Sequence, residues 1–270
     1  MEQEDVVSDG NRSDYNTDIC KAQHPVDASR SLHFVSDFPH LIKCLRNGLL
    51  KSSFNTPAGE VSLCPLRKAL ELDGSNVTLQ AMSGITSSHT NPNNFEKMRV
   101  PFAFQVFGDK VLNGLRLYET ELERNCGSIQ PVLTFVGMIR DVIEIMTSRF
   151  PRQALRPDSA SEDKLLSFLT YLTAWELHAG GRGGFLSAST APGLRVTIGS
   201  VLSLLTYLTE NVGYKYLMTA KLSQDPVKNL FGICDECHKL LLTKKDDVDC
   251  LAAAQYTRLR DNGGLLYPTG

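Results

Sequence analysis

Five residues, Cys234-Asp-Glu-Cys-His238, have the spacing closest to that of a metal or cofactor site. They match C-x-x-C-H, the pattern of c-type haem attachment, which requires export of the chain. The first residues, MEQEDVVSDG, are acidic and lack the apolar region of an export signal. Zinc would need a fourth ligand, and no second cysteine pair follows at zinc-ribbon spacing. Free thiols on a helix are therefore the favoured interpretation.

A glycine run, Gly180-Gly-Arg-Gly-Gly184, is the segment whose composition comes nearest to a phosphate-binding loop. Such a loop also needs a lysine followed by a hydroxyl residue, and neither follows here. The chain also lacks the G-x-S-x-G pattern of a nucleophile elbow and the H-E-x-x-H pattern of a zinc enzyme. The run predicts a flexible connector, and generic motifs assign no catalysis to this chain.

Asp37 stands between an expected strand and an expected helix. Residues 32–36 show the alternation of one short strand, and Pro39 suits the first turn of the helix that follows. A carboxylate at the end of a buried strand is held rigidly enough to bind Mg²⁺ beside other ligands. Aspartate is also a favoured helix N-cap, so the position by itself is compatible with both roles.

The elements around these residues are almost all helical. A short helix is expected between Pro65 and Gly74, and residues 83–94, rich in Ser, Thr, Asn and His, predict a loop. Beyond this loop, hydrophobic residues recur at helical spacing, which indicates the buried faces of helices in a mainly α protein. These stripes run from Phe104 to Tyr118, from Val132 to Met146, from Leu165 to Leu172 and from Leu194 to Leu208.

Composition limits the classes of function. The 270 residues, 42% of them hydrophobic, suffice for one large domain or two small ones. A formal net charge of -2 does not attract a polyanion to the whole surface, so any contact with DNA would be local. The seven cysteines are odd in number and scattered, which indicates reduced thiols in the nucleus or cytosol. No apolar run approaches the length that spans a bilayer, so we expect a chain that is neither secreted nor inserted in a membrane.

Two segments carry a family resemblance. Residues 33–47 (HFVSDFPHLIKCLRN) and 221–232 (KLSQDPVKNLFG) resemble signature stretches of P-element-type transposases and their THAP-domain relatives. Lys97-Met-Arg-Val100 and Gly193-Leu-Arg-Val-Thr-Ile198 resemble the same family in the same order. The similarity covers roughly residues 20 to 235.

The resemblance implies a fold in two parts: an RNase H-like (α/β) catalytic core interrupted by a mostly helical GTP-binding insertion domain. We predict a disordered acidic segment at 1–30, an incomplete RNase H-like core at 31–82 and the helical insertion at 83–222. A remnant of the C-terminal part of the RNase H-like domain is expected at 223–270. The family also implies a nuclear location, and it leaves the formation of a homo-oligomer open.

The catalytic residues of this family are two aspartates and one glutamate around divalent metal. Asp37 matches the second aspartate, a remnant of an ancestral Mg²⁺ site, whereas no strand that would carry the first is expected upstream. The family's Ser-Gln-Asp-x-x-Glu motif has Lys228 in place of the glutamate, and an ammonium repels a metal ion at contact distance. The zinc module that recognises DNA is missing as well. The resemblance therefore predicts a chain that does not cleave DNA, with DNA a partner of the ancestral full-length protein only.

The nucleotide-binding residues of the family are better retained. Asp225 matches the aspartate that contacts guanine, whose adjacent N1–H and N2–H₂ donors suit one carboxylate. The family's Phe-Asp-x-x-Asn-Ser-Arg run corresponds to residues 143–149, so Glu144 and Thr147 replace an aspartate and an asparagine and would hold the nucleotide less well. Lys110 is the candidate partner of the phosphates, against a second interpretation as a solvated helix lysine. Weak binding of GTP follows from the resemblance.

Two other functions stay open on the sequence. A catalytically silent helical scaffold, or a genomic remnant, would bind neither nucleotide nor DNA. A working transposase would need an aspartate and a glutamate that this sequence does not show.

Overall fold

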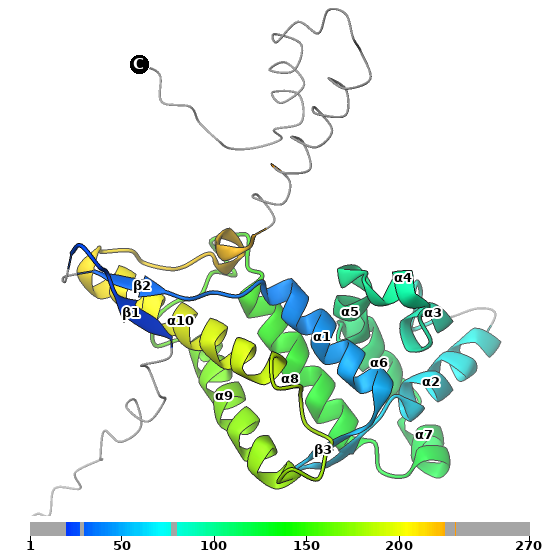
Figure 1. Ribbon diagram of the computed structural model, residues 1–270. Coiled ribbons are helices and arrows are strands. Elements are labelled where there is room, and N and C mark those ends of the chain that lie inside the picture. Colours follow the sequence, from blue (N-terminus) through cyan, green and yellow to red (C-terminus); the bar gives the residue numbers. More distant parts are fainter. Residues whose placement is uncertain (1–19, 28–29, 77–79, 225–229, 231–270) are drawn as a thin grey trace, which may run out of the picture. The chain divides into compact units, whose positions relative to one another are not determined.

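The computed structural model describes residues 20–27, 30–76, 80–224 and 230 (Figure 1). The chain divides into two compact units, Met1–Leu222 and Ser223–Gly270, and nearly all the described residues belong to the first. This first unit is mainly helical, as the sequence predicts. In chain order its helices are α1 (Phe38–Lys51), α2 (Cys64–Ser75), α3 (Ser87–Thr90), α4 (Asn94–Lys97), α5 (Val100–Val106), α6 (Asp109–Leu117), α7 (Glu119–Cys126), α8 (Gln130–Met146), α9 (Ala160–Ala179), α10 (Thr190–Asn211) and the 3₁₀ turn η2 (Thr219–Leu222).

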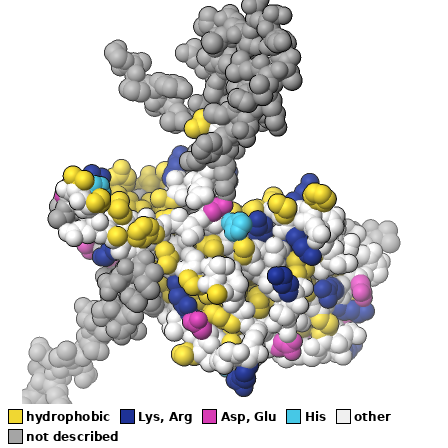
Figure 2. All heavy atoms as spheres, viewed as in Figure 1, with side chains coloured by type: hydrophobic (Ala, Val, Ile, Leu, Met, Phe, Trp, Pro, Cys, Tyr) yellow, Lys and Arg dark blue, Asp and Glu magenta, His cyan; other side chains and the backbone are white. Residues whose placement is uncertain are grey.

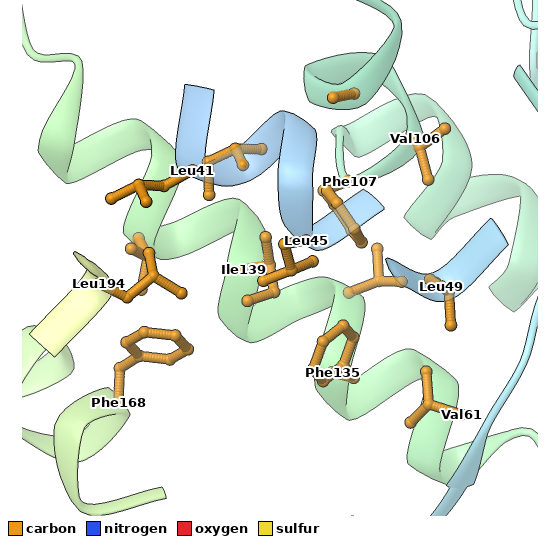
Figure 3. Close-up of a cluster of buried hydrophobic side chains, with 14 of the residues drawn as sticks. Leu41, Leu45, Leu49, Val61, Val106, Phe107, Phe135, Ile139, Phe168 and Leu194 are labelled. Carbon is orange, nitrogen blue, oxygen red and sulfur yellow. The ribbon is translucent and has the colours of Figure 1, made fainter. Parts of the chain in front are cut away.

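The core of this unit lies around α8, whose buried face contacts residues from several other helices. Figure 3 shows Phe135 and Ile139 of α8 among side chains from α1, α9 and α10, including Leu45, Phe168 and Leu194. All five side chains are 0% or 1% exposed, so each has lost almost its whole contact with water. Burial of this kind is what stabilises helices too short to persist alone.

An aromatic cluster centres on Phe135. Its ring centroid lies 5.8 Å from that of Phe54, 6.2 Å from that of Phe107 and 5.6 Å from that of Trp175, all in edge-on arrangements. The Trp175 indole N–H donates to the carbonyl of Gly184 at 3.0 Å, which satisfies the one polar atom of this cluster. The cluster joins α8 and α9 to the segment after α1.

The helices expected from hydrophobic spacing are present, with two differences. The single stripe from Phe104 to Tyr118 belongs to two helices, α5 and α6, because Gly108 is extended and serves as the N-cap of α6. The loop expected at 83–94 contains α3, which the Thr86 and His89 side chains cap reciprocally. The polar residues that suggested a loop are the caps of a short helix.

The described strands form two antiparallel hairpins of three-residue strands. β1 (Lys21–Gln23) pairs with β2 (Ser31–His33), and β3 (Phe54–Thr56) pairs with β4 (Gly59–Val61). The predicted strand at 32–36 is thus shorter and begins one residue earlier. β1 lies inside the segment 1–30 that was expected to be disordered, because backbone pairing with β2 requires no apolar side chains.

The β1–β2 hairpin lies outside the hydrophobic core. Its strands are largely exposed, and Val26, Leu32 and Phe34 remain 89%, 41% and 49% exposed. In Figure 2, hydrophobic side chains gather over this hairpin and the adjoining end of α10, while Lys and Arg side chains spread over the other helices. The expectation that Asp37 follows a buried strand is therefore wrong: β2 gains its backbone hydrogen bonds from β1 and not from a buried sheet.

By its length and composition alone, α10 could cross a membrane, although no membrane span was expected from the sequence. Core helices of soluble proteins can be equally long and apolar. Here Leu194, Ile198, Val201 and Leu205 of α10 are fully buried, and α10 packs against α1 and α9. Its hydrophobic stripe is part of the protein core.

The glycine run at 180–184 is anchored at its end. Gly184 has a φ of +79°, and a Cβ added there would lie 2.7 Å from the backbone nitrogen of Asn55. The carbonyl of Gly184 accepts hydrogen bonds from Asn55 N at 2.8 Å and from Trp175. Glycine is needed at this position because only it combines the left-handed backbone with so close an approach of β3.

Candidate functional site

A buried pair of hydroxyls joins the residue just after the C-cap of α8 to the first residue of η2. Ser148 Oγ lies 3.0 Å from Thr219 Oγ1, and the backbone N–H of each residue donates to the other's hydroxyl at 3.2 Å. Ala220 N also donates to the carbonyl of Ser148 at 3.1 Å. Segment 143–149, which the sequence singled out, is therefore held beside the first residues of η2, and the second such segment, 221–232, begins two residues after Thr219.

A second link holds the loop after α8. Leu155 and Leu217 exchange backbone hydrogen bonds of 2.9 and 2.8 Å, and both side chains are buried. Arg156 continues this loop and is fixed by its own contacts, because it donates to the carbonyls of Ala154 and Pro151 at 3.0 and 2.6 Å. Its guanidinium carbon lies 5.2 Å from the ring centroid of Tyr216.

A groove of about 630 Å³ opens between the end of α8, this loop and the start of α9. This volume lies in the range of small-ligand sites. The residues that line it combine carboxylates, cations, hydroxyls and one exposed aromatic ring. They are Asp141, Glu144, Ile145, Phe150, Arg152, Gln153, Ala154, Arg156, Ser159, Ser161 and Lys164.

The charges of the groove are only partly compensated. Lys164 pairs with Asp141 at 2.8 Å, whereas the exposed Arg152 makes no hydrogen bond or ion pair with any described residue. Glu144 is likewise exposed and without a polar partner in the described part of the chain. The groove thus offers one guanidinium and one carboxylate to a ligand, with the positioned guanidinium of Arg156 beside them.

The wall of the groove on α8 is held by a row of ion pairs. Asp109 of α6 accepts from Arg140 at 3.0 Å, Arg140 pairs with Asp141, and Asp141 accepts from Lys164 of α9. Burial by itself raises the pKa of the Asp141 carboxyl, but the hydrogen bonds from Lys164 and Arg140 outweigh this effect and hold the pKa below its usual range. The carboxylate therefore stays ionised and links three helices at neutral pH.

One side of the groove is the start of α9, where Ser159 is the N-cap residue. The Ser159 hydroxyl accepts from the backbone N–H of Glu162 at 3.4 Å, and the Glu162 carboxylate accepts from Asp158 N at 2.7 Å. In a standard capping box the third residue of the helix would accept from the N–H of the N-cap, Ser159. Here Glu162 accepts instead from the residue before the N-cap, Asp158. This cap fixes the direction in which Ser161 and Lys164 leave the helix.

The structure brings together only part of the predicted nucleotide site. Glu144 lines the groove, whereas Thr147 is at the C-cap of α8 and donates its hydroxyl proton to the carbonyl of Ile143 at 2.7 Å. Lys110 lies outside the lining, and its Nζ donates to the carbonyl of Ser83 at 2.6 Å. Asp225 lies outside the described residues.

The predicted catalytic remnant, Asp37, is the N-cap residue of α1, although its side chain makes no cap hydrogen bond. Among the described residues, no three His, Cys, Asp or Glu side chains gather where they could share a metal ion. Lys228 and the Cys234–His238 motif lie outside the described residues.

Comparison with known proteins finds a family model, a curated relative and a solved structure that resemble this chain. Residues 39–156 match the family of the TNP-like, GTP-binding insertion domain. The Transposable element P transposase of Drosophila melanogaster is 24% identical over 212 residues, which cover 77% of this chain and 28% of that protein. The solved Drosophila P element transposase strand transfer complex has the same fold over 80% of this chain and 49% of its own, with a TM-score of 0.67 and 23% identity.

Residues 39–156 are thus similar to a transposase-like GTP-binding insertion domain. They contain α1 from its second residue onward, α2 to α8 and the first part of the loop behind the groove. Over most of its length the chain is similar to a part of the P-element transposase. It spans 28% of the length of the curated relative that it matches. The matched range begins at residue 39, inside the segment 31–82 that the sequence assigned to an RNase H-like core, and that assignment stays a prediction.

Sequence reasoning missed the cations of the groove. Arg152 and Arg156 were not singled out, nor was Lys164, because none of them falls in a familiar motif. A signal was present, since residues 149–156 (RFPRQALR) hold three arginines and no acidic residue. Such a cluster next to a predicted helix start favours an anion site over a solvated surface.

Proposed function

We propose that this chain binds guanine nucleotide in the groove between α8 and α9. The observation that carries the proposal is the buried Ser148–Thr219 pair, which holds the end of α8 against the segment leading to residue 222. The family resemblance locates nucleotide binding in residues 143–149 and 221–232, and the second of these segments begins two residues after Thr219. The match to a GTP-binding insertion domain over residues 39–156 supports the same ligand.

Guanine recognition is assigned to Glu144 within the groove. Its exposed carboxylate can accept from both N1–H and N2–H₂ of guanine, whereas adenine presents an acceptor at N1 and leaves the carboxylate unpaired. An unpaired charged group costs about 1 to 3 kcal/mol or more, which is enough to select the base. The ring of Phe150, 65% exposed on the lining of the groove, offers a face on which a base can stack. The sequence predicts Asp225 as the base-recognising group and Glu144 as a secondary contact, so we propose that Glu144 recognises the base together with Asp225.

The phosphates are assigned to the basic side of the groove. Arg152 has no competing partner among the described residues, and Arg156 is already oriented by the carbonyls of its own loop. A planar guanidinium forms paired, charge-assisted hydrogen bonds with phosphate oxygens. Arg152 therefore gains a partner on binding without losing one.

We further propose that the chain does not cleave DNA and is nuclear, as the family resemblance implies. Lys228 at the position of the catalytic glutamate supports the loss of cleavage, as does the lack of a described carboxylate cluster that includes Asp37. Nucleotide binding without strand cleavage is the activity that these observations favour.

Calorimetric titration of the full chain with GTP, GDP and ATP tests this function. We expect heat with the guanine nucleotides, weaker heat with ATP, and a loss of the guanine preference in Glu144→Gln and in Asp225→Asn. Glu123→Gln is the matched control, because Glu123 is an exposed carboxylate on α7 outside the groove. If no guanine nucleotide produces heat, the proposal fails and the chain is a helical scaffold.

A further inference from the structure

Two cysteines far apart in the sequence meet at the ends of two packed helices. Cys64 is the first residue of α2 and Cys126 is the last residue of α7. Their Sγ atoms lie 2.7 Å apart, although 62 positions separate them in the chain. Cys20 and Cys44 are also free, and within the described residues neither makes a hydrogen bond to another thiol.

The surrounding structure holds both thiols in place. α2 and α7 pack against each other, and the neighbours of Cys64, Leu63 and Pro65, are buried. On α7, Leu122 is fully buried one turn before Cys126, and Gly127 ends the helix with a φ of +75°. A residue with a side chain is strained at that φ, so the glycine places the turn directly after the thiol. The approach of the two sulfurs is therefore built into the packing of the helices.

The two thiols differ in their surroundings. Cys64 is exposed, whereas Cys126 is half-buried. Burial, followed by the hydrogen bond to Cys64, raises the pKa of the Cys126 thiol to about 11. The Lys68 ammonium lies near both: its own pKa is raised mainly by Glu71, with smaller contributions from Cys126 and Cys64. A reagent in solution therefore reacts first with the exposed Cys64 thiol, and the Cys126 thiol reacts second.

We propose that Cys64 and Cys126 form a reversible redox site, a dithiol that a low-molecular-weight disulfide such as oxidised glutathione converts to an intramolecular disulfide. The Cys64 thiolate attacks the glutathione disulfide, whose S–S bond breaks and releases one glutathione thiolate. The Cys126 thiolate then attacks Cys64 Sγ and displaces the second. The two thiol protons pass to the two glutathione thiolates, so the protein loses two electrons and glutathione gains them.

The disulfide has a structural consequence for the insertion domain. It closes a covalent loop that contains α3 to α6 and ties α2 to α7. Closing so long a loop restricts the unfolded chain and stabilises the folded one. In a reducing compartment the pair stays as a dithiol, and it closes when the glutathione pool is oxidised. This device is independent of nucleotide binding.

Peptide mapping of the full chain after incubation with oxidised glutathione tests the proposal. Without reductant, trypsin should yield residues 52–67 joined to residues 125–140, with the loss of two hydrogen atoms, and dithiothreitol should separate them. Thermal unfolding should shift upward by roughly 5 °C or more on oxidation. Cys64→Ser should lose both effects, and Cys44→Ser, a matched control on α1, should keep both.

Three results would overturn it. One is that Cys64 and Cys126 both remain alkylatable after incubation. Another is that Cys64 links to a different cysteine of the chain. The third is that the melting shift persists in Cys64→Ser. Since Cys64 is exposed, its replacement by serine leaves the core intact, and Cys126→Ser provides an independent second variant.

Discussion

The side chains of Ser148 and Thr219 form a reciprocal pair: the hydroxyl of each accepts the backbone N–H of the other at 3.2 Å, across 71 positions of sequence. Both side chains are buried, at 1% and 3% exposure. The pair is the joint between the last turn of α8 and η2. It holds residues 143–149 beside the start of η2.

Thr219→Val tests this joint. The substitution keeps the shape of the side chain but leaves the Ser148 N–H buried without an acceptor, which costs about 1 to 3 kcal/mol. We expect the free energy of unfolding in urea to fall by this amount and guanine nucleotide affinity to fall with it. Thr209→Val is the control, because the Thr209 hydroxyl bonds only to carbonyls of its own helix. Equal losses of stability and of nucleotide affinity in the two variants would contradict a role of the Ser148–Thr219 pair in nucleotide binding.

Arg152→Gln tests the phosphate assignment. Removing a charge-assisted hydrogen bond of about 1.5 to 3 kcal/mol should weaken GTP binding roughly tenfold or more. Lys110→Gln is the comparison, because sequence reasoning assigned the phosphates to Lys110, whose Nζ donates to Ser83 in this structure. We expect calorimetry to show the larger loss in Arg152→Gln. If only Lys110→Gln weakened GTP binding, the phosphates would have to be assigned to Lys110 on α6 and not to the groove.

Asp141→Asn should change stability with pH. The pKa of Asp141 is lowered in the folded protein, so its contribution to stability is present above its unfolded value and is lost as pH falls through the folded one. The variant should therefore be less stable at neutral pH, and its deficit should shrink below about pH 4, near the ordinary aspartate pKa. Thermal unfolding at several pH values measures this. In the control variant Glu123→Gln, the difference in melting temperature from the parent should not shrink at low pH.

Phe135→Ala should remove the centre of the aromatic cluster. Because Phe135 is fully buried among Phe54, Phe107 and Trp175, the cavity and lost contacts should cost about 3 to 5 kcal/mol in the free energy of unfolding. Leu117→Ala is the surface control, since Leu117 is 58% exposed and should lose only a few tenths. A small loss at Phe135 would mean that the core repacks around the gap.

The purified chain should not nick supercoiled plasmid DNA with Mg²⁺ or Mn²⁺. The expectation rests on Lys228 and on Asp37, which no other carboxylate joins in a described metal cluster. Agarose electrophoresis after incubation with each metal should give the same result for the parent and for Asp37→Ala. Strand cleavage by the parent that disappears in Asp37→Ala would show an active metal site.

The sequence by itself determined the long helices and which of their faces are buried. Hydrophobic spacing over residues 132–146 and 194–208 predicted α8 and α10, because that spacing follows from the local geometry of one helix. Glu144 came from the family resemblance and lines the groove. The break at Gly108 and the short hairpins were missed, since caps and backbone pairing leave little trace in hydrophobic patterns.

Only the tertiary structure decided which residues far apart in the sequence lie side by side. Arg152, Lys164 and Glu144 share a groove because Ser148 bonds to Thr219 and Leu155 to Leu217, contacts that join residues more than sixty positions apart. The meeting of Cys64 with Cys126 has the same origin in helix packing. Periodicity constrains each helix relative to its own axis, whereas the position of one helix against another depends on how all the buried side chains fit together.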